Sequence, residues 1–381
     1  MFITPSHGLT SEDTPRMSLS GFLESMPEKT NSAISPQGIK WLAAMMYAGA
    51  DNQTAAELKN VFHFEETPVQ VARRLNKESF VNVAEPNVPS LRIANGMWTD
   101  KRLSLEPDFQ KSMNDDFGVY LSACDFENEL ESVRTSINEW VHLQTNGEIT
   151  SLFKDLHPDS RLVLVNTICF RSEWMSPFDA KLTSRQRFAL PDGRRTEVMM
   201  MRKQLRCSYS ESAEAICVEL PYTSENMAML FILPRNPRNW RNLEKLMSEE
   251  KINTWCESME LEEVDCMIPK MELVESFDLR AVFQNLGVES PFSAQNADFT
   301  KMSPDTDLFI SQAIQNIRIE IDESGTTASA AGAAAFAPKA SPQNSPDRKR
   351  FYANRPFWFV IRDTETGTIF FLGKFLGNPA L

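Results

Sequence analysis

Apolar residues recur at helical spacing in the first third of the chain. After Ser35-Pro36 they fall three or four residues apart, at Ile39, Leu42, Ala43 and Met46. This spacing puts them on one face, and proline suits a first helical turn, so the pattern predicts a buried helix. Between Val133 and Leu143, a stripe formed by Ile137, Trp140 and Val141 predicts an amphipathic helix.

Strand patterns dominate the rest of the chain. Residues 90–98 alternate between apolar and polar side chains, whereas residues 161–170 are almost continuously apolar and predict the centre of a large sheet. Further strands are expected at Ala215–Leu220, Met227–Leu233, Val264–Ile268, Leu308–Gln312, Trp358–Arg362 and Thr368–Leu372. The last two flank Thr364–Gly367, which predicts a hairpin turn. Early helices followed by hairpin-linked strands indicate an α+β fold.

A long run of small side chains lies between two apolar segments, Ile317–Ile321 and Phe357–Ile361. We call it the small-residue segment; it extends from Glu323 to Lys339 and is rich in alanine. A connection of this length inside a compact domain is uncommon and usually functional. The segment is therefore the first candidate for a functional element.

The small-residue segment is compatible with a β-strand. No charge or proline interrupts it from Thr326 to Ala337, so it could enter a sheet and complete a hydrogen-bond ladder, which a passive linker would not require. Extended at ~3.3 Å per residue, the run from Gly325 to Lys339 spans about 50 Å. A globule of this size has a diameter of about 55 Å. Insertion would therefore carry anything attached at Lys339 from one pole of the molecule to the other.

Composition narrows the function classes. The chain has 381 residues, enough for one large domain or two ordinary ones, and is 42% hydrophobic and 24% charged, as in soluble globular proteins. A formal net charge of −13 argues against a nucleic-acid partner. No apolar run reaches the ~18 residues of a membrane helix, so no membrane partner is expected.

The N-terminus, Met1–His7, lacks the basic start and continuous apolar core of a secretory signal. The chain is therefore expected either in the cytoplasm or in the extracellular space, the latter by another export route or after loss of a leader.

The cysteines and the single sequon suggest no covalent framework. The six cysteines contain no CxxC pair, and a chain of this length needs no staples, so we expect free thiols that pack as small hydrophobes at Cys124, Cys169, Cys207, Cys217, Cys256 and Cys266. Asn52-Gln53-Thr54 is a glycosylation sequon. Thr54 is equally suited to cap a helix that begins at Ala55.

Catalytic patterns are absent from the sequence. The four histidines, His7, His63, His142 and His157, lie in no metal-binding or nucleophile motif, and His142 falls in the predicted amphipathic helix. No phosphate-binding or dinucleotide-binding glycine motif occurs. Acidic runs such as Glu260–Glu263 are typical of solvated faces. We therefore expect no enzyme activity, no metal and no cofactor.

A series of landmarks from about Ser18 to the C-terminus resembles the serpins. In family order they are Asn31–Pro36, Ile137–Asn138 with Thr145–Ile149, Leu164–Asn166 with Phe170 and Trp174, Glu219–Tyr222, Pro269–Lys270, Ala297–Phe299, and Asn354–Phe357. The resemblance implies one domain over residues 1–381 and a monomer. It also implies the serpin fold, with three β-sheets, about eight or nine helices and an exposed reactive-centre loop at about residues 323–355.

The resemblance also implies a mechanism. A serpin of the inhibitory kind presents its loop as bait, and a serine protease forms an acyl intermediate with the bait residue. The severed loop then inserts into the main sheet and carries the protease with it. The residues that the resemblance assigns are the hinge (Glu323, Gly325, Thr326, Ala328, Ala330, Ala331), the breach at Trp174, and the shutter (Ser35, Asn166, Gln315).

The bait position sets the class of protease. Counted from Glu323 as in inhibitory members, the seventeenth residue is Lys339, and the reactive bond is Lys339–Ala340. A lysine there implies a trypsin-like serine protease, whose pocket carries a carboxylate. In a neighbouring register, Phe336 would suit a chymotrypsin-like enzyme and the alanine run an elastase. A serpin that does not inhibit, and instead carries a ligand, chaperones or stores amino acids, is the alternative.

Three features depart from the family pattern or lie outside it. Gln315 stands in place of the shutter histidine and Gly38 in place of a shutter serine; glutamine can also hydrogen-bond there. The cluster Asp347–Arg350 is a candidate second bait, processing site, exosite or solvated flank. Arg73, Arg74 and Lys77 lie where some relatives bind heparin, which makes a glycosaminoglycan a further candidate partner.

Overall fold

The computed structural model describes residues 19–78, 90–149, 156–224, 226–305, 308–326 and 348–377. The α-helices within these ranges are α1 (Leu19–Ser25), α2 (Pro36–Gly49), α3 (Asn52–Phe62), α4 (Pro68–Glu78), α5 (Pro107–Asp115), α6 (Leu130–Gln144), α7 (Trp240–Leu246), α8 (Glu249–Glu257) and α9 (Arg280–Asn285). Three short 3-10 turns accompany them: η1 (Ala180–Leu182), η2 (Pro237–Asn239) and η3 (Ser290–Phe292).

The strands of the described ranges form two hydrogen-bonded sheets. The six-stranded sheet has the order β10 (Met271–Asp278), β11 (Gln312–Ile321), β12 (Gly325–Thr326), β4 (Leu162–Glu173), β2 (Ser90–Asp100) and β3 (Tyr120–Cys124). The nine-stranded sheet contains β1 (Ser32–Ile34), β15 (Ile369–Phe375), β14 (Phe357–Asp363), β8 (Met227–Pro234), β7 (Ala215–Pro221), β6 (Arg195–Glu211), β9 (Glu260–Pro269), β13 (Lys349–Tyr352) and β5 (Ser184–Ala189).

Three sheets were expected, and the long strand β6 accounts for the difference. Its first residues pair with β5, its middle with β9 and its last with β7. One continuous strand therefore links what would otherwise be two separate sheets. The nine α-helices of the described ranges agree with the expected eight or nine, and the α+β class is confirmed.

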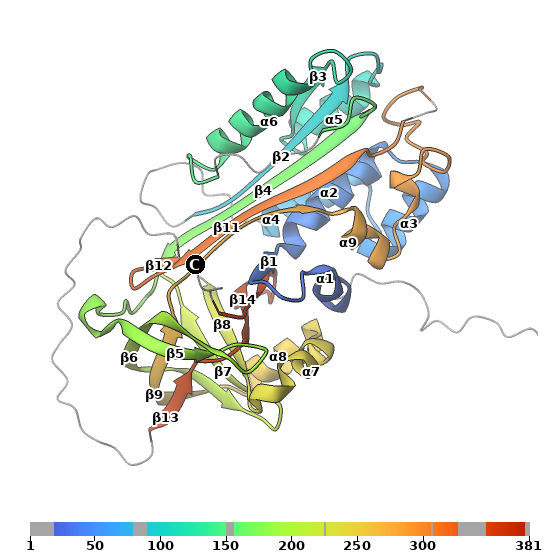
Figure 1. The fold of residues 1–381 in the computed structure, drawn as a ribbon. Coiled ribbons are helices and arrows are strands. Elements are labelled where there is room, and N and C mark those ends of the chain that lie inside the picture. The colour runs from blue at the N-terminus through green and yellow to red at the C-terminus, as the bar shows by residue number, and fades with distance from the viewer. Residues whose placement is uncertain are drawn as a thin grey trace, which may run out of the picture.

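Helices cover both faces of the six-stranded sheet (Figure 1). Helix α6 packs Ile137 and Trp140 against Val163 and Val165 of β4. On the opposite face, α2 packs against the alternate residues of the same strand, including Leu164. Because both faces of β4 are covered, its side chains are apolar almost without interruption, as the sequence indicated.

Local chemistry explains where α2 begins. Ser35 is the N-cap, and its hydroxyl accepts a hydrogen bond from the Gly38 amide at 3.1 Å. Pro36 occupies the first helical position, as expected.

The sequence placed two boundaries wrongly. Thr54 does not cap α3: Asp51 is the cap, and Thr54 is buried one turn inside, where its hydroxyl accepts a hydrogen bond from the Asp298 amide. The strand expected at Leu308–Gln312 begins only at Gln312 and continues to Ile321. Leu308 and Ile310 are buried core residues outside any strand, and burial alone produced the misleading pattern.

The cysteines form no disulfide bonds: all six are free, as predicted. None of the helices in the described ranges is long and apolar enough to cross a membrane.

Candidate functional site

The small-residue segment begins inside the six-stranded sheet. Gly325 and Thr326 form β12, which lies between β11 and β4 and is antiparallel to both (Figure 1). Thr326 pairs with Ile321 on one side and with Ser172 on the other. Below this point β11 and β4 pair directly and in parallel, from Gln312–Arg318 to Val163–Cys169. The sheet is therefore already parted at one end by the first residues of the segment.

Thr326 is anchored in a buried aromatic site. Its side chain is fully buried, and its hydroxyl lies 2.6 Å from the Tyr222 hydroxyl. The Tyr222 ring stacks on Trp174 with centroids 4.5 Å apart. Burial also raises the pKa of Tyr222 far above its usual value, so the phenol stays neutral and can donate to Thr326.

Trp174, the predicted breach residue, holds the turn that precedes β12. Its indole nitrogen donates to the Asp322 carbonyl at 3.0 Å, and its backbone amide donates to the Ser324 carbonyl at 2.8 Å. The Asp322 carboxylate in turn accepts hydrogen bonds from the amides of Ser324 and Gly325. These bonds fix the reversal between β11 and β12.

Gly325 is required by close backbone approach. A Cβ atom at this position would lie closer than 3.0 Å to the carbonyl oxygen of Ser172 and to Cα of Glu173. Both are backbone atoms of a central strand and cannot move aside cheaply. Only glycine fits between the two strands here, and this close approach explains why the predicted hinge has glycine at position 325.

Glu323 ties the segment to two neighbouring elements. Its carboxylate accepts hydrogen bonds from Thr183 at 2.7 Å and from the Lys270 ammonium at 2.6 Å, and its carbonyl accepts one from the Phe178 amide. Burial opposes ionisation of this carboxylate, but the hydrogen bonds from Lys270 and Thr183 outweigh it, so the pKa of Glu323 lies below its usual value.

The predicted shutter residues meet in one buried hydrogen-bond network. Gln315 of β11 accepts from the Ser35 amide at 2.9 Å and donates to the Ser35 carbonyl at 3.0 Å. It also donates to the Asn166 side chain of β4 at 3.1 Å. Asn166 donates to Asn95 of β2 at 2.8 Å. Three strands and the start of α2 are thus joined through side chains with little or no exposure.

Gly38 makes room for this network. A Cβ atom at Gly38 would lie closer than 3.0 Å to both the Asn166 Oδ1 and the Gln315 Nε2 atoms. The two departures from the family pattern, at positions 38 and 315, therefore belong together: the glutamine amide occupies space that a side chain at position 38 would need.

Several predicted residues lie outside the described ranges. They are the bait pair Lys339 and Ala340 and the hinge alanines Ala328, Ala330 and Ala331. The described site consists of Glu323, Gly325 and Thr326 with the breach and shutter residues. Sequence reasoning did not single out Lys270, Thr183 or Asn95 for it. Lys270 was named only as a family landmark, and no local signal indicates these contacts, because Lys270 and Thr183 are 53 and 140 positions from Glu323, and Asn95 is 71 positions from Asn166.

The basic cluster after the segment is part of a sheet. Lys349 and Arg350 belong to β13, which pairs in parallel with β9. The Lys349 ammonium lies 5.8 Å from the centre of the Tyr209 ring. A protease binds its substrate as a free extended chain, so this paired strand is unsuited to a second bait.

Two of the three predicted heparin-binding cations on α4 have acidic neighbours. Arg74 forms ion pairs with Glu66 and Glu78, and Arg73 lies 3.9 Å from Asp116. The two ion pairs neutralise Arg74 and so weaken the heparin interpretation of Arg73, Arg74 and Lys77 at that residue.

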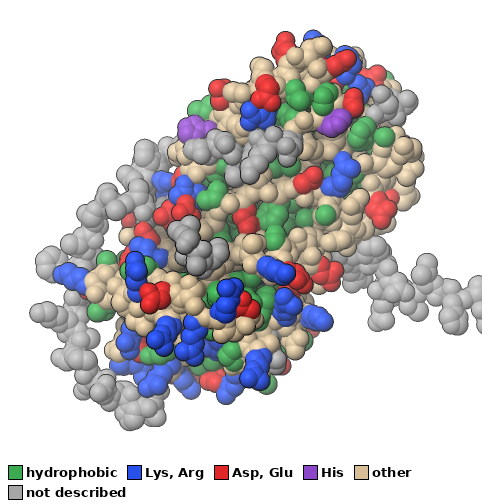
Figure 2. Space-filling model, in the orientation of Figure 1, with side chains coloured by type: hydrophobic (Ala, Val, Ile, Leu, Met, Phe, Trp, Pro, Cys, Tyr) green, Lys and Arg blue, Asp and Glu red, His purple; other side chains and the backbone are tan. Residues whose placement is uncertain are grey.

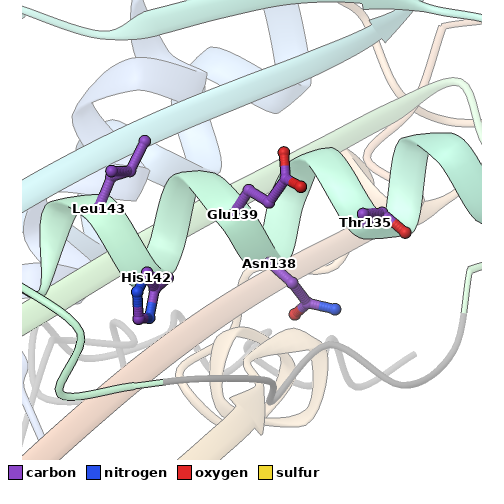
Figure 3. A pocket seen from close by; sticks show the side chains of 5 residues that line it. All are labelled: Thr135, Asn138, Glu139, His142 and Leu143. Atoms are coloured by element: carbon purple, nitrogen blue, oxygen red, sulfur yellow. The ribbon is translucent and has the colours of Figure 1, made fainter.

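Elsewhere in the described ranges, side chains that could suggest chemistry do not converge. Four polar side chains and Leu143 line a pocket on α6, where Figure 3 shows Glu139 and Leu143 pointing away from Asn138 and His142. No group of three or more His, Cys, Asp or Glu side chains suited to a metal was found in the described ranges. Burial raises the pKa of Cys169 and Cys207 to about 12 and that of Cys256 to about 11, so these thiols stay protonated.

Fold and site together define a class of protein: an α+β molecule whose central sheet admits a segment of its own chain between two parallel strands. The chain belongs to the serpin family, whose model, described as serine protease inhibitor, matches residues 17–378.

Individual relatives agree with this assignment. The chain is 32% identical to the human (Homo sapiens) leukocyte elastase inhibitor over 91% of this chain and 92% of that protein. The native structure of the thermophilic serpin tengpin gives a TM-score of 0.85 at 24% identity and covers 98% of this chain and 96% of that one. A complex of thyroxine-binding globulin with thyroxine gives 0.83 at 24% identity, covering 96% and 99%.

Proposed function

We propose that this chain inhibits serine proteases as a suicide substrate and is not itself an enzyme. The observation that carries the proposal is β12: the first residues of the small-residue segment already lie as a strand between β11 and β4. Because β12 is antiparallel to both neighbours, its continuation would replace one parallel pairing with two antiparallel ones. Antiparallel pairing is slightly more stable per residue, so insertion is favoured once the chain is free to move.

The register of β12 supports a complete insertion. Six residues beyond Thr326, Gly332 would fall opposite Asn166, which is six residues before Ser172 in β4, and opposite Gln315, six before Ile321 in β11. A residue without a side chain would then meet the crowded shutter network. Phe336 would fall opposite Leu162, where β4 begins, and Pro338, which has no amide hydrogen to donate, would lie beyond the sheet.

The chemistry is that of acyl transfer. The protease serine would attack the Lys339 carbonyl, the bond to Ala340 would break, and Ala340 would become a free amine while an ester forms with the enzyme. Insertion up to Phe336 would then move the ester across the molecule before water can cleave it. The inhibitor supplies no catalytic group to this sequence of steps.

We propose a trypsin-like enzyme as the target, because the Lys339 ammonium matches a specificity pocket with a carboxylate. One observation favours a second candidate: the chain is similar to the leukocyte elastase inhibitor, and an elastase would accept the alanine run of the small-residue segment. The non-inhibitory alternative rests on the fold alone, since a thyroxine-binding protein shares it. Small residues at every hinge position after Glu323 argue for insertion and against that alternative.

Incubation with trypsin, followed by denaturing electrophoresis and mass spectrometry, tests this function. We expect a covalent complex that resists denaturation and a fragment that begins at Ala340. This fragment should separate only on denaturation, because β13, β14 and β15 hold it in the nine-stranded sheet. A complex with elastase and a cut within the alanine run would assign the bait residue to that run instead of to Lys339. Degradation by both enzymes without a complex would favour the non-inhibitory alternative.

A further inference from the structure

An exposed basic face adjoins the hinge of the small-residue segment. In antiparallel strands, directly opposite residues share a face. Arg185 and Arg187 of β5 lie opposite Met199 and Glu197 of β6, and Arg195 of β6 follows on the same face two residues before Glu197. All five side chains are exposed, whereas Phe188, Val198 and Met200 on the other face are buried in the core. We call these five residues the basic face.

The charge of the basic face differs from that of the molecule. It carries three arginines against one glutamate, although the whole chain has a formal net charge of −13. No ion pair links Arg185, Arg187 or Arg195 to any described residue. Figure 2 shows Lys and Arg side chains gathered over the region where Figure 1 places β5, β6 and β9. Cations that pair with no acidic side chain of the described residues are available to a partner.

The basic face also has an apolar component. Met199, at the centre of the face, is 40% exposed as a residue, and Leu182, next to the face in the η1 turn beside β6, is 56% exposed. Exposed apolar side chains among arginines suit a folded protein surface. A sulfated polysaccharide would use the charges and leave the apolar atoms unsatisfied.

Position connects this surface to the bait. The loop that leads into β5 is bonded to the start of the small-residue segment, through Thr183 and Phe178 to Glu323. The bait loop, which is the chain between β12 and β13, ends where β13 pairs with β9. Strand β9 in turn pairs with β6. The basic face therefore belongs to the elements at which both ends of the bait loop are held.

We propose that the basic face is a docking surface for the target protease, which would present an acidic patch beside its active site. This inference rests on the proposed function and deepens it. Opposite charges would speed the first encounter, before any bond at the bait is attacked. Electrostatic steering of this kind raises association rates by roughly 10- to 1,000-fold and weakens as salt is added.

The test compares anionic and cationic isoforms of trypsin as probes. The second-order rate of complex formation is measured for the native chain and for Arg185→Glu/Arg187→Glu at about 0.05 and 0.5 M NaCl, where the screening length falls from over ~10 Å to under ~8 Å. At low salt the double variant should react about tenfold more slowly with anionic trypsin, with no slowing for cationic trypsin. The difference should shrink at high salt.

Two controls keep the result specific. Arg73→Glu/Lys77→Glu on α4 changes the net charge equally, and this helix packs on α2, away from the nine-stranded sheet. It should leave both rates unchanged. Arg185→Gln/Arg187→Gln avoids placing a new glutamate opposite Glu197, in case the reversal disturbs folding. It should show the same selectivity to a smaller extent.

The outcomes separate this inference from the function it rests on. If complexes form but both trypsins are insensitive to Arg185 and Arg187, the docking surface is refuted and the inhibitory function stands. If the variants change only elution from immobilised heparin, the face binds a polysaccharide and the inference is overturned. If neither trypsin forms a complex with the native chain, the proposed function fails and the docking surface with it.

Discussion

Thr326 shows most directly how one side chain can control insertion. It is fully buried, its hydroxyl lies 2.6 Å from that of Tyr222, and its backbone pairs with strands on both sides. Small size and a hydroxyl are what this position accepts. A charged side chain would be buried there without a partner, which costs several kcal/mol or more, so β12 would be driven out of the sheet and could not lead the segment in.

Thr326→Arg should therefore convert the inhibitor into a substrate. Trypsin would still cut at Lys339, but the severed segment would not insert, and the acyl ester would be hydrolysed. The stoichiometry of trypsin inhibition measures this outcome. Thr326→Ser keeps the hydroxyl and should inhibit normally. Full inhibition by Thr326→Arg would show that position 326 has no part in insertion.

Gly38 is a second position where one atom matters, because a Cβ there would collide with Asn166 and Gln315. Gly38→Ala should lower the stability of the intact molecule by about 1–3 kcal/mol, the usual cost of an overpacked core. Thermal unfolding measures this loss. In an Asn166→Ala background the nearest colliding atom is gone, so the same substitution should cost less. Equal costs in both backgrounds would contradict the packing account.

At the scale of elements, the hinge and the shutter differ in their response to pH. The shutter residues Ser35, Gln315 and Asn166, and Asn95 which is bonded to them, have no side chain that titrates between pH 5 and 8. The hinge contains Glu323, whose pKa is lowered in the folded molecule. A lowered carboxyl pKa stabilises the fold fully above the unfolded pKa, near 4.5, and this stabilisation is lost as the pH falls through the folded value.

Glu323→Gln therefore gives a prediction with a defined pH window. Between pH 6 and 8 the variant should be less stable by about 1 kcal/mol, because Lys270 is 40% exposed and solvent weakens the ion pair. The difference from the native chain should decline as the pH falls below about 4.5. Thermal unfolding at several pH values measures it. A constant difference from pH 3.5 to 8 would mean that the charge of Glu323 does not matter.

The sequence predicted elements well where one physical signal dominates. The continuous apolar run of β4, the stripe on α6 and the Ser35-Pro36 start of α2 each have a single explanation, and each is confirmed. The strand predicted at Leu308–Gln312 was wrong, because a buried irregular segment and a buried strand have the same apolar composition. The Glu323–Lys270 ion pair could not be predicted, since tertiary contacts across 53 positions leave no periodic trace.

At the scale of the molecule, the fold combines a closed sheet with a segment suited to open it. Seven residue pairs hold β11 to β4 in parallel, and β12 has entered at one end only. Extending β12 to Phe336 would add on the order of ten ladder hydrogen bonds, each about 1 kcal/mol net. The intact molecule would then be the less stable of two arrangements of the same chain.

The thermal stability of the molecule before and after cleavage at the bait tests this central claim most directly. At about 2–4 °C per kcal/mol for a large domain, the chain cut between Lys339 and Ala340 should unfold about 20 °C or more above the intact chain. Cut Thr326→Arg should show no such rise. A cut native chain that unfolds at or below the temperature of the intact chain would contradict the account.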